Sequence, residues 1–233
     1  IRGKMKKIFI FLTLITISIA SDGNISGVTY FDYTNNDNES EFNFNRQYIN
    51  YSINSSDHLK FIVVFDVGRT DKIDGEDTRL VTFLKKAQID YNCSFGKVSL
   101  GLIGMNTYGT QEKNWGYRFI EKSAIDLNKF SSTADLGIGF SRDIIDRLNF
   151  NIQMINGEGF KKAQNDKYHK ISLNATYGEK NINASNGYNV GIVYTMEPYD
   201  LITGELDTSK KNITMTSIYA GCSSKSLRFG FEY

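Results

Sequence analysis

The sequence predicts an all-β fold, an antiparallel transmembrane β-barrel, and three observations lead to that prediction. Segments of about ten residues alternate apolar and polar side chains, which places each kind on its own face of a strand. The connections between these segments are alternately short and long. After Ala20, no apolar run approaches the roughly twenty residues that a helical membrane span needs. We therefore expect strands, rather than helices, to cross the membrane.

The N-terminal segment has the layout of a secretory signal peptide. Met5 is followed by two lysines, by the apolar run Ile8–Ile19 and by a small-x-small cleavage site that ends at Ala20. A membrane anchor is the alternative, but the apolar run is short for a span of roughly twenty residues. We expect residues 1–20 to be removed during export and residues 21–233 to form the barrel in the cell outer membrane.

Composition restricts the class of protein further. Lys and Arg total 27 and Asp and Glu total 26, so the formal net charge of +1 gives no electrostatic support for nucleic-acid binding. Phe and Tyr number 16 and 14 whereas Pro occurs once, which favours strands joined by polar turns.

The alternation predicts about eleven strands. Segment 59–68 is typical, because its odd-numbered residues are apolar while Lys60 and Asp66 lie on the opposite face. The other clearly alternating segments are 46–53, 98–102, 135–141, 148–154, 170–177, 188–195 and 227–233. Three weaker segments are 27–34, 81–92 and 213–222. In segment 81–92, Lys85 falls on the apolar face, where it would snorkel to the interface or contact a second protomer.

The lengths of the connections alternate along the chain. The short ones are Ser55–Asp57, Cys93–Gly96, Asp143–Asp146, Glu179–Asn186 and Ser223–Lys225. The long ones are Asn35–Asn43, Arg69–Leu80, Thr107–Thr133, Gly157–Lys167 and Glu197–Asn212. Short periplasmic turns and longer external loops are typical of transmembrane barrels, whereas a soluble sandwich has no reason to sort its loops in this way.

The strand count also bears on completeness. With a periplasmic N-terminus the eleventh strand runs outward and lacks a partner, although closed single-chain barrels usually have an even number of strands. We therefore expect the barrel to continue beyond Tyr233. The alternative is that segment 227–233, which ends on an aromatic residue, is the C-terminal strand of the complete barrel.

The longest connection, Thr107–Thr133, is the candidate functional element. It follows the fifth strand and mixes aromatic and charged residues, so we expect it to fold into the barrel and narrow it. The residues predicted to form this constriction are Trp115, Tyr117, Arg118, Glu121, Lys122 and Asp126. The alternative is an ordinary external loop held on the rim by Trp115 and Phe119.

Charged residues of both signs are predicted to face the lumen. They are Arg46, Lys60, Asp66, Lys86, Asp90, Asp135, Lys170, Arg228 and Glu232. A ring of one sign would indicate ion selectivity, whereas this mixture predicts a hydrated and weakly selective pore. Equally, the charges could only solvate the lumen or pair across it.

Three segments carry a resemblance to a known family. Gly101–Tyr108, Trp115–Lys122 and Ser131–Ile138 resemble the porins of marine bacteria, which are similar in layout to the general and phosphate-selective porins. The resemblance covers about Gly27 to Tyr233 and implies a barrel of about sixteen strands. It also implies a homotrimer in outer-membrane lipid and lipopolysaccharide, with the third external loop folded inward. Thr107–Thr133 is the third external loop, but no basic phosphate-binding ladder is evident in this sequence.

Catalytic and metal sites are poorly supported. The two histidines are His58 and His169, and the nearest serine to the second, Ser172, lies on the opposite face of its strand. We therefore predict no enzyme and no cofactor. Cys93 and Cys222 lie in hairpins far apart and are predicted to be unpaired, with a disulfide as the alternative.

Two further features are exposed in the predicted fold. The acidic residues Asp71, Asp74, Glu76 and Asp77 are predicted to be a solvated charge run, with a Ca²⁺ site as the alternative. Tyr177, Tyr188 and Tyr194 are predicted to face lipid as part of interfacial girdles.

The sequence leaves three functions open. The first is a water-filled channel for passive diffusion of small hydrophilic solutes or ions. The second is a structural or adhesive outer-membrane barrel whose external loops bind ligands. The third, weaker hypothesis is a soluble secreted β-sandwich that binds glycans.

Overall fold

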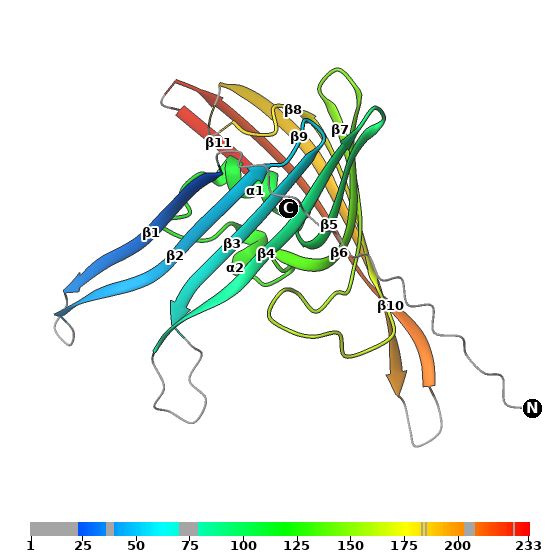
Figure 1. The fold of residues 1–233 in the computed structure, drawn as a ribbon, viewed down its shortest axis with the longest axis horizontal. Helices are drawn as coiled ribbons and strands as arrows, with labels where there is room; N and C mark the ends of the chain where they lie inside the picture. The colour runs from blue at the N-terminus through cyan, green and yellow to red at the C-terminus, as the bar shows by residue number, and fades with distance from the viewer. Residues whose placement is uncertain are drawn as a thin grey trace, which may run out of the picture.

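The computed structural model describes residues 23–35, 40–69, 79–182, 184, 186–202, 208–225 and 227–233. Eleven strands form one antiparallel sheet in which the order of the strands is their order along the chain (Figure 1). The strands are β1 (Asn24–Asn35), β2 (Ser40–Asn54), β3 (Leu59–Arg69), β4 (Leu80–Cys93), β5 (Gly96–Gly104), β6 (Ala134–Ile145), β7 (Leu148–Ile155), β8 (Lys170–Gly178), β9 (Gly187–Ile202), β10 (Thr208–Ser224) and β11 (Leu227–Glu232). The predicted all-β class and the number of strands are confirmed.

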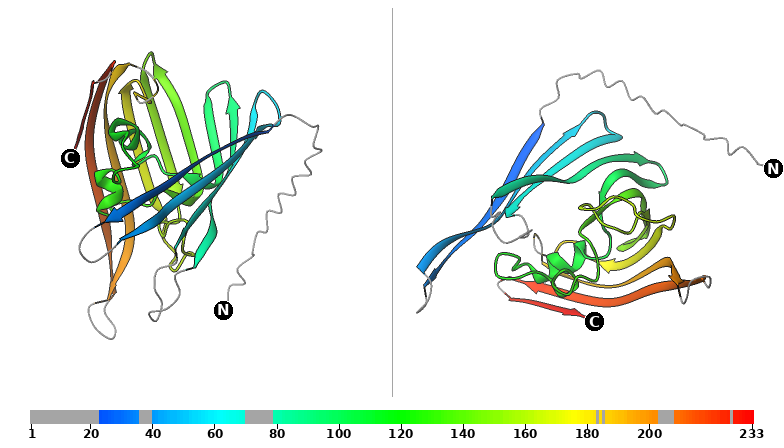
Figure 2. Two further views of the ribbon diagram at one scale, coloured as in Figure 1. Left: turned by 90° about the vertical axis from the view of Figure 1, so that its left-hand side faces the viewer. Right: turned by 90° about the horizontal axis from the view of Figure 1, so that it is seen from below.

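The sheet curls around an interior but does not close. No pairing joins β1 to β11 within the described residues, so both strands are edges of the sheet. Two short helices, α1 (Gly109–Trp115) and α2 (Ala124–Leu127), lie inside the curve between β1–β4 and β9–β11 (Figure 2, right). The architecture is therefore that of an open, barrel-like sheet with a folded segment on its concave side.

The connections differ in length at the two ends of the sheet. Tight turns at Ser94–Phe95 and Asp146–Arg147 join strands at one end, at the top of Figure 1. The connections 105–133 and 156–169 both begin at the opposite end, where β5 and β7 finish. We call the first end the turn end.

The predicted loop Glu197–Asn212 is wrong for most of its length. β9 continues to Ile202 and β10 begins at Thr208, and the two strands pair in register from Met196–Thr214 to Ile202–Thr208. The sequence hid this extension because Ser209, Lys210, Lys211 and Asn212 are all polar, so no apolar face marks the strand. Main-chain pairing carries the hairpin onward, and Lys167 and Tyr168 contact Asp200 of β9. The predicted loop Asn35–Asn43 also shrinks, since β1 ends at Asn35 and β2 begins at Ser40.

The distribution of polarity is the reverse of that in a water-soluble sheet. Among the residues that the structure describes, sixteen buried residues are polar or charged, whereas eight are hydrophobic. The convex face instead exposes large apolar side chains, such as Leu136 at 52% and Met154 at 48% exposed. The alternation of each strand therefore directs polar residues inward and apolar residues outward.

A β-bulge in β4 changes the orientation of one predicted residue. Val64 pairs with Lys86 and Phe65 pairs with Leu84, so Lys85 is the extra residue of the bulge. Its Nζ lies 3.8 Å from Oδ2 of buried Asp66 and 4.2 Å from the centroid of the Tyr48 ring. The prediction that Lys85 faces lipid is thus wrong, because the bulge turns two consecutive lysines to the concave side.

The structure has a small hydrophobic core where connection 105–133 leaves β5. Ile103, Met105 and Ile155 are buried together there, and Tyr108 packs against them. Within the described part of the chain, no helix is long and apolar enough to cross a membrane.

Candidate functional site

Connection 105–133 lies on the concave side of the sheet, where it divides the interior. Its first anchor is Asn106, which bonds to β7 and β8. The main-chain N–H of Asn106 donates to Gln153 Oε1 (2.9 Å), and its Nδ2 donates to Asn151 Oδ1 (2.8 Å). Asn174 Nδ2 donates to the Asn106 carbonyl (2.7 Å), and Ser172 Oγ donates to Asn106 Oδ1. A single residue, through its main chain and its side chain, therefore fixes the start of the connection on two strands.

The second anchor joins α1 to β9 and β10. Asn114 and Asn189 are buried at 4% and 2% exposed, and their side-chain amides form two reciprocal hydrogen bonds of 2.7 and 2.8 Å. Gly221 on β10 makes room for this contact, since a Cβ there would lie 2.5 Å from Asn114 Cγ. The lack of a side chain at Gly221 thus lets α1 lie directly on the wall.

The segment after α1 folds back on itself. Gly116 ends the helix in the left-handed region (φ 68°) and donates its N–H to the Glu112 carbonyl. Trp115 Nε1 donates to the Glu121 carbonyl (2.8 Å), which closes the following turn. Arg228 of β11 then places its guanidinium 5.7 Å from the centroid of the Tyr117 ring.

A cluster of charged residues lies where connection 105–133 meets the wall formed by β1–β4. Asp66 is 2% exposed and accepts a hydrogen bond from Arg46 Nη1 (3.2 Å), with Lys85 on its other oxygen. Arg118 Nε lies 3.7 Å from Glu112 Oε1, and its guanidinium lies 5.7 Å from the Tyr30 ring centroid on β1. The connection therefore touches both edge strands, β11 through Tyr117 and β1 through Arg118.

The pKa of Glu112 is shifted by its surroundings in α1. Burial raises the pKa of the Glu112 carboxyl, while the positive charges of Lys85 and Arg118 oppose that rise and Asp126 adds to it. Glu112 therefore takes up a proton at a higher pH than an ordinary glutamate.

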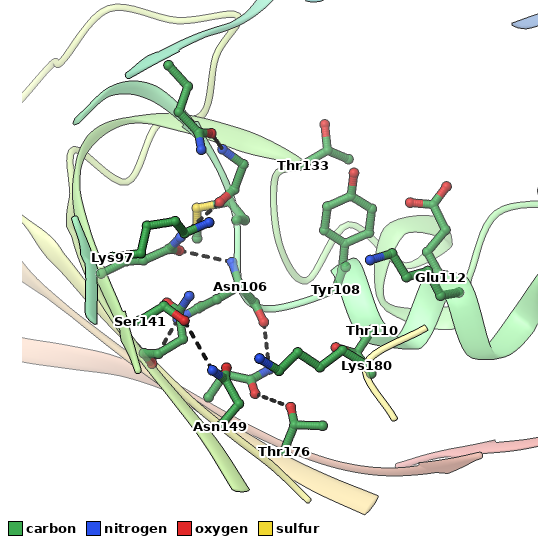
Figure 3. Close-up of a pocket in the computed structure, with 18 of the residues that line it drawn as sticks. Lys97, Asn106, Tyr108, Thr110, Glu112, Thr133, Ser141, Asn149, Thr176 and Lys180 are labelled. Atoms are coloured by element: carbon green, nitrogen blue, oxygen red, sulfur yellow. Dashed lines mark hydrogen bonds between the residues drawn. The ribbon is translucent and has the colours of Figure 1, made fainter. Parts of the chain in front are cut away.

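A cavity of about 990 Å³ lies between α1 and the inner wall of β4–β8 (Figure 3). In Figure 3, Tyr108 and Glu112 approach it from the connection, and Lys97, Ser141 and Asn149 approach it from the strands. Of the six predicted constriction residues, only Arg118 lines this cavity. Sequence reasoning missed Tyr108, Glu112 and Lys113. The four-residue spacing of Tyr108 and Glu112, which places both on one side of a helix, was a signal that could have indicated the first two.

The other predicted constriction residues lie on a different side of the connection. Trp115, Tyr117, Glu121 and Lys122 line a smaller cavity of about 450 Å³ that faces β11. Asp126 on α2 lines neither cavity, and its charge instead acts on Glu112. The physical reason is the chain reversal after α1, because Gly116 ends the helix and the turn closed by Trp115 and Glu121 directs neighbouring residues to different sides.

The predicted lumen charges also separate into groups. Lys86 lines the large cavity, and Arg228 and Glu232 line the small one. Asp90 is buried and does not line the cavity, but it accepts from Ser99 Oγ (2.6 Å) and pairs with Lys97, which does. Lys60 is the register partner of Asp90. These positions share the concave face of the sheet.

Two of the predicted lumen charges have local structural roles. Asp135 accepts the N–H groups of Gly157 (2.8 Å) and Gly159 (3.1 Å) and so holds the connection between β7 and β8. Lys170 Nζ lies 2.6 Å from Glu197 Oε2. With Arg46 and Asp66 already paired, few of the predicted charges are available to a solute.

The remaining chemistry-bearing residues form no site in the part of the chain that the structure describes. His58 lies beside the Tyr91 ring (6.3 Å between centroids), and Cys93 and Cys222 are not joined to each other. Among the described residues no group of three His, Cys, Asp or Glu side chains could hold a metal ion. The acidic residues Asp71, Asp74, Glu76 and Asp77 and the predicted signal peptide lie outside the described residues.

Comparison with known proteins gives no assignment, since no family model and no curated protein matches this chain.

Proposed function

We propose that this protein forms a water-filled channel in the bacterial outer membrane, through which small hydrophilic solutes or ions diffuse passively. One observation carries the proposal. A polar cavity, narrowed by an inward-folded connection, lies on the concave face of a sheet whose convex face is apolar.

The apolar convex face favours a lipid environment. Soluble monomers rarely expose contiguous apolar patches of more than a few hundred Å². Here the outward positions of successive strands expose Leu100, Ile138, Met154 and Ile192, which lie on four different strands of one sheet. An outward apolar band with a polar interior is the arrangement of outer-membrane barrels.

Aromatic residues near the turn end support the same orientation. Tyr51, Tyr91, Tyr177 and Tyr188 are each between 40 and 49% exposed and lie near the turn-end termini of β2, β4, β8 and β9. Aromatic girdles of this kind mark the membrane–water interfaces of transmembrane barrels. The turn end would therefore face the periplasm.

The proposal requires partners for the two edges of the sheet. Backbone groups along an open edge would be unsatisfied in lipid. We propose that further strands pair with β1 and β11, and that the protein is a signal-peptide-exported homotrimer embedded among outer-membrane lipid and lipopolysaccharide, as the resemblance to porins implies. Transport needs no covalent step, since the dimensions and charges of the constriction select the solutes.

Reconstitution tests the proposal. The full-length gene product should fractionate with outer membranes, migrate differently on gels before and after heating, and give discrete conductance steps in planar bilayers. Recovery in soluble form would overturn the membrane assignment. Membrane-bound protein that gives no conductance steps would overturn the channel and favour a structural or adhesive barrel.

A further inference from the structure

The large cavity lies on the turn side of the constriction. Lys97 follows the tight turn at Ser94–Phe95, and Asp143 precedes the one at Asp146–Arg147. Lys180 follows the end of β8, and α1 covers the opposite side of the cavity. A solute that passes the constriction would therefore cross this cavity, which we call the vestibule.

Positive charge predominates in the vestibule. Its cationic lining comes from the concave face, from connection 105–133 and from the β8–β9 connection, and consists of Lys86, Lys97, Lys113, Arg118 and Lys180. Among the described residues, the carboxylates that line it are Glu112 and Asp143. Arg142 also borders the vestibule but occupies a register position opposite Phe150, on the outward face, so it does not add to the charge of the interior.

Two of these cations lack a carboxylate partner. Lys97 pairs with Asp90 at 3.5 Å, Lys180 pairs with Asp143 at 2.7 Å, and Arg118 pairs with Glu112 at 3.7 Å. For Lys86 and Lys113, no carboxylate oxygen of the described residues lies within 4.0 Å. They come from opposite sides of the vestibule, one from β4 and the other from α1.

The surroundings of Lys113 disfavour its charge. Burial lowers the pKa of the Lys113 ammonium, Glu112 opposes this, and the like charges of Lys180 and Lys97 lower the pKa further. An anion between these ammonium groups would remove part of that repulsion. The polar neighbours Asn149, Asn174 and Thr176 line the wall and carry no compensating negative charge.

We propose that the vestibule makes the channel prefer anions over cations, with Lys86 and Lys113 as the residues that determine this preference. The inference rests on the proposed channel function and names its class of solute, small anions. It differs from the weak selectivity predicted by the mixed charges in the sequence, because Asp66, Asp90 and Asp135 are held in local ion pairs or hydrogen bonds and do not line the cavity. A low-dielectric wall focuses the field of unpaired charges. A positive potential of about half a kT per unit charge already gives about a threefold preference for anions over cations, because it enriches the anion and depletes the cation.

The test is the reversal potential of the full-length protein in planar bilayers under a KCl gradient. We expect about a threefold preference for chloride over potassium. The double variant Lys86→Gln with Lys113→Gln should bring the permeability ratio close to one. Lys210→Gln with Lys211→Gln, which removes two equal charges from the β10 extension, should leave the ratio unchanged.

The outcomes separate this inference from the function beneath it. Absence of conductance steps would overturn the channel itself. Steps with a chloride-to-potassium ratio at or below one, or equal effects of the two double variants, would overturn the anion vestibule alone. If the first variant does not fold, the parent protein alone tests the anion preference. Replacing chloride by gluconate should then reduce its conductance more than replacing potassium by choline. The opposite order would overturn the inference.

Discussion

At the scale of single residues, Lys85 shows how one inserted residue changes a prediction. On each side of the bulge in β4, inward and outward residues alternate regularly. The two alternating series are out of phase by one residue, because Lys85 is inserted between them. Leu84 stays on the convex face, while Lys85 and Lys86 both turn inward. A sequence pattern with period two cannot locate such a bulge, because polar residues on either side of it fit both phases.

Cysteine accessibility tests the bulge. In a background without Cys93 and Cys222, we expect Lys85→Cys in the reconstituted protein to react with a small charged methanethiosulfonate, because the proposed channel has an aqueous lumen. Leu84→Cys is the matched control and should react only with a lipid-soluble reagent. The reverse pattern would restore the lipid-facing assignment of Lys85 and contradict the bulge.

Glu112 gives a prediction for pH. Burial raises the pKa of this carboxyl, so it is protonated as the pH falls through a value above that of an ordinary glutamate. Protonation removes a negative charge from the vestibule, so anion preference should rise with acidification. Reversal potentials measured from pH 8 to pH 5 should show this rise in the parent protein. Glu112→Gln should begin at the higher preference and lose that step, and a step that persisted in this variant would assign the titration to another group.

At the scale of elements, the inward position of connection 105–133 depends on close contact between α1 and the wall. A Cβ at Gly221 would lie 2.5 Å from Asn114 Cγ, and Asn114 cannot move without breaking its two hydrogen bonds to Asn189. Leaving a buried amide unsatisfied costs about 1–3 kcal/mol. Gly221→Ala should therefore weaken the docking of α1.

The matched control for that variant is one strand away. At Gly230 on β11 an added Cβ would lie 3.6 Å from the Asn114 carbonyl oxygen, which is an ordinary contact. We expect Gly221→Ala, and not Gly230→Ala, to enlarge the single-channel conductance and to expose 105–133 to proteolysis. Equal behaviour of the two variants would mean that this contact does not hold the connection in place.

The elements also show what the sequence could predict. Alternating strands such as β3, β7 and β8 were located to within a residue or two, because one face of each is apolar. The extension of β10 shows no apolar face because it is polar on both faces. The extension of β9 shows none because it mixes Glu197, Pro198 and Asp200 with apolar residues. In the candidate site, the connection itself could be identified by its length, but the side chains that line the cavity could not, since short helices and turns decide which of Arg118 and Lys122 faces it.

At the scale of the whole molecule, the polarity of the sheet predicts how stability depends on position. Ile138 is exposed in the middle of β6, paired with Leu100 and Met154, and Leu80 is exposed at the terminus of β4 away from the turn end. A charged side chain facing lipid costs about 2–4 kcal/mol at the membrane midplane and about 0–1 kcal/mol near an interface.

Ile138→Arg should therefore lower the free energy of unfolding in lipid bilayers by about 2–4 kcal/mol, and Leu80→Arg by about 1 kcal/mol or less. Urea titration of the refolded full-length protein in vesicles measures both values. In water alone, replacing an exposed isoleucine by arginine would change stability little, usually within about 0.5 kcal/mol. Two small and equal effects would thus show that the apolar convex face does not lie in hydrocarbon. A protein partner, rather than a membrane, would then have to cover that face.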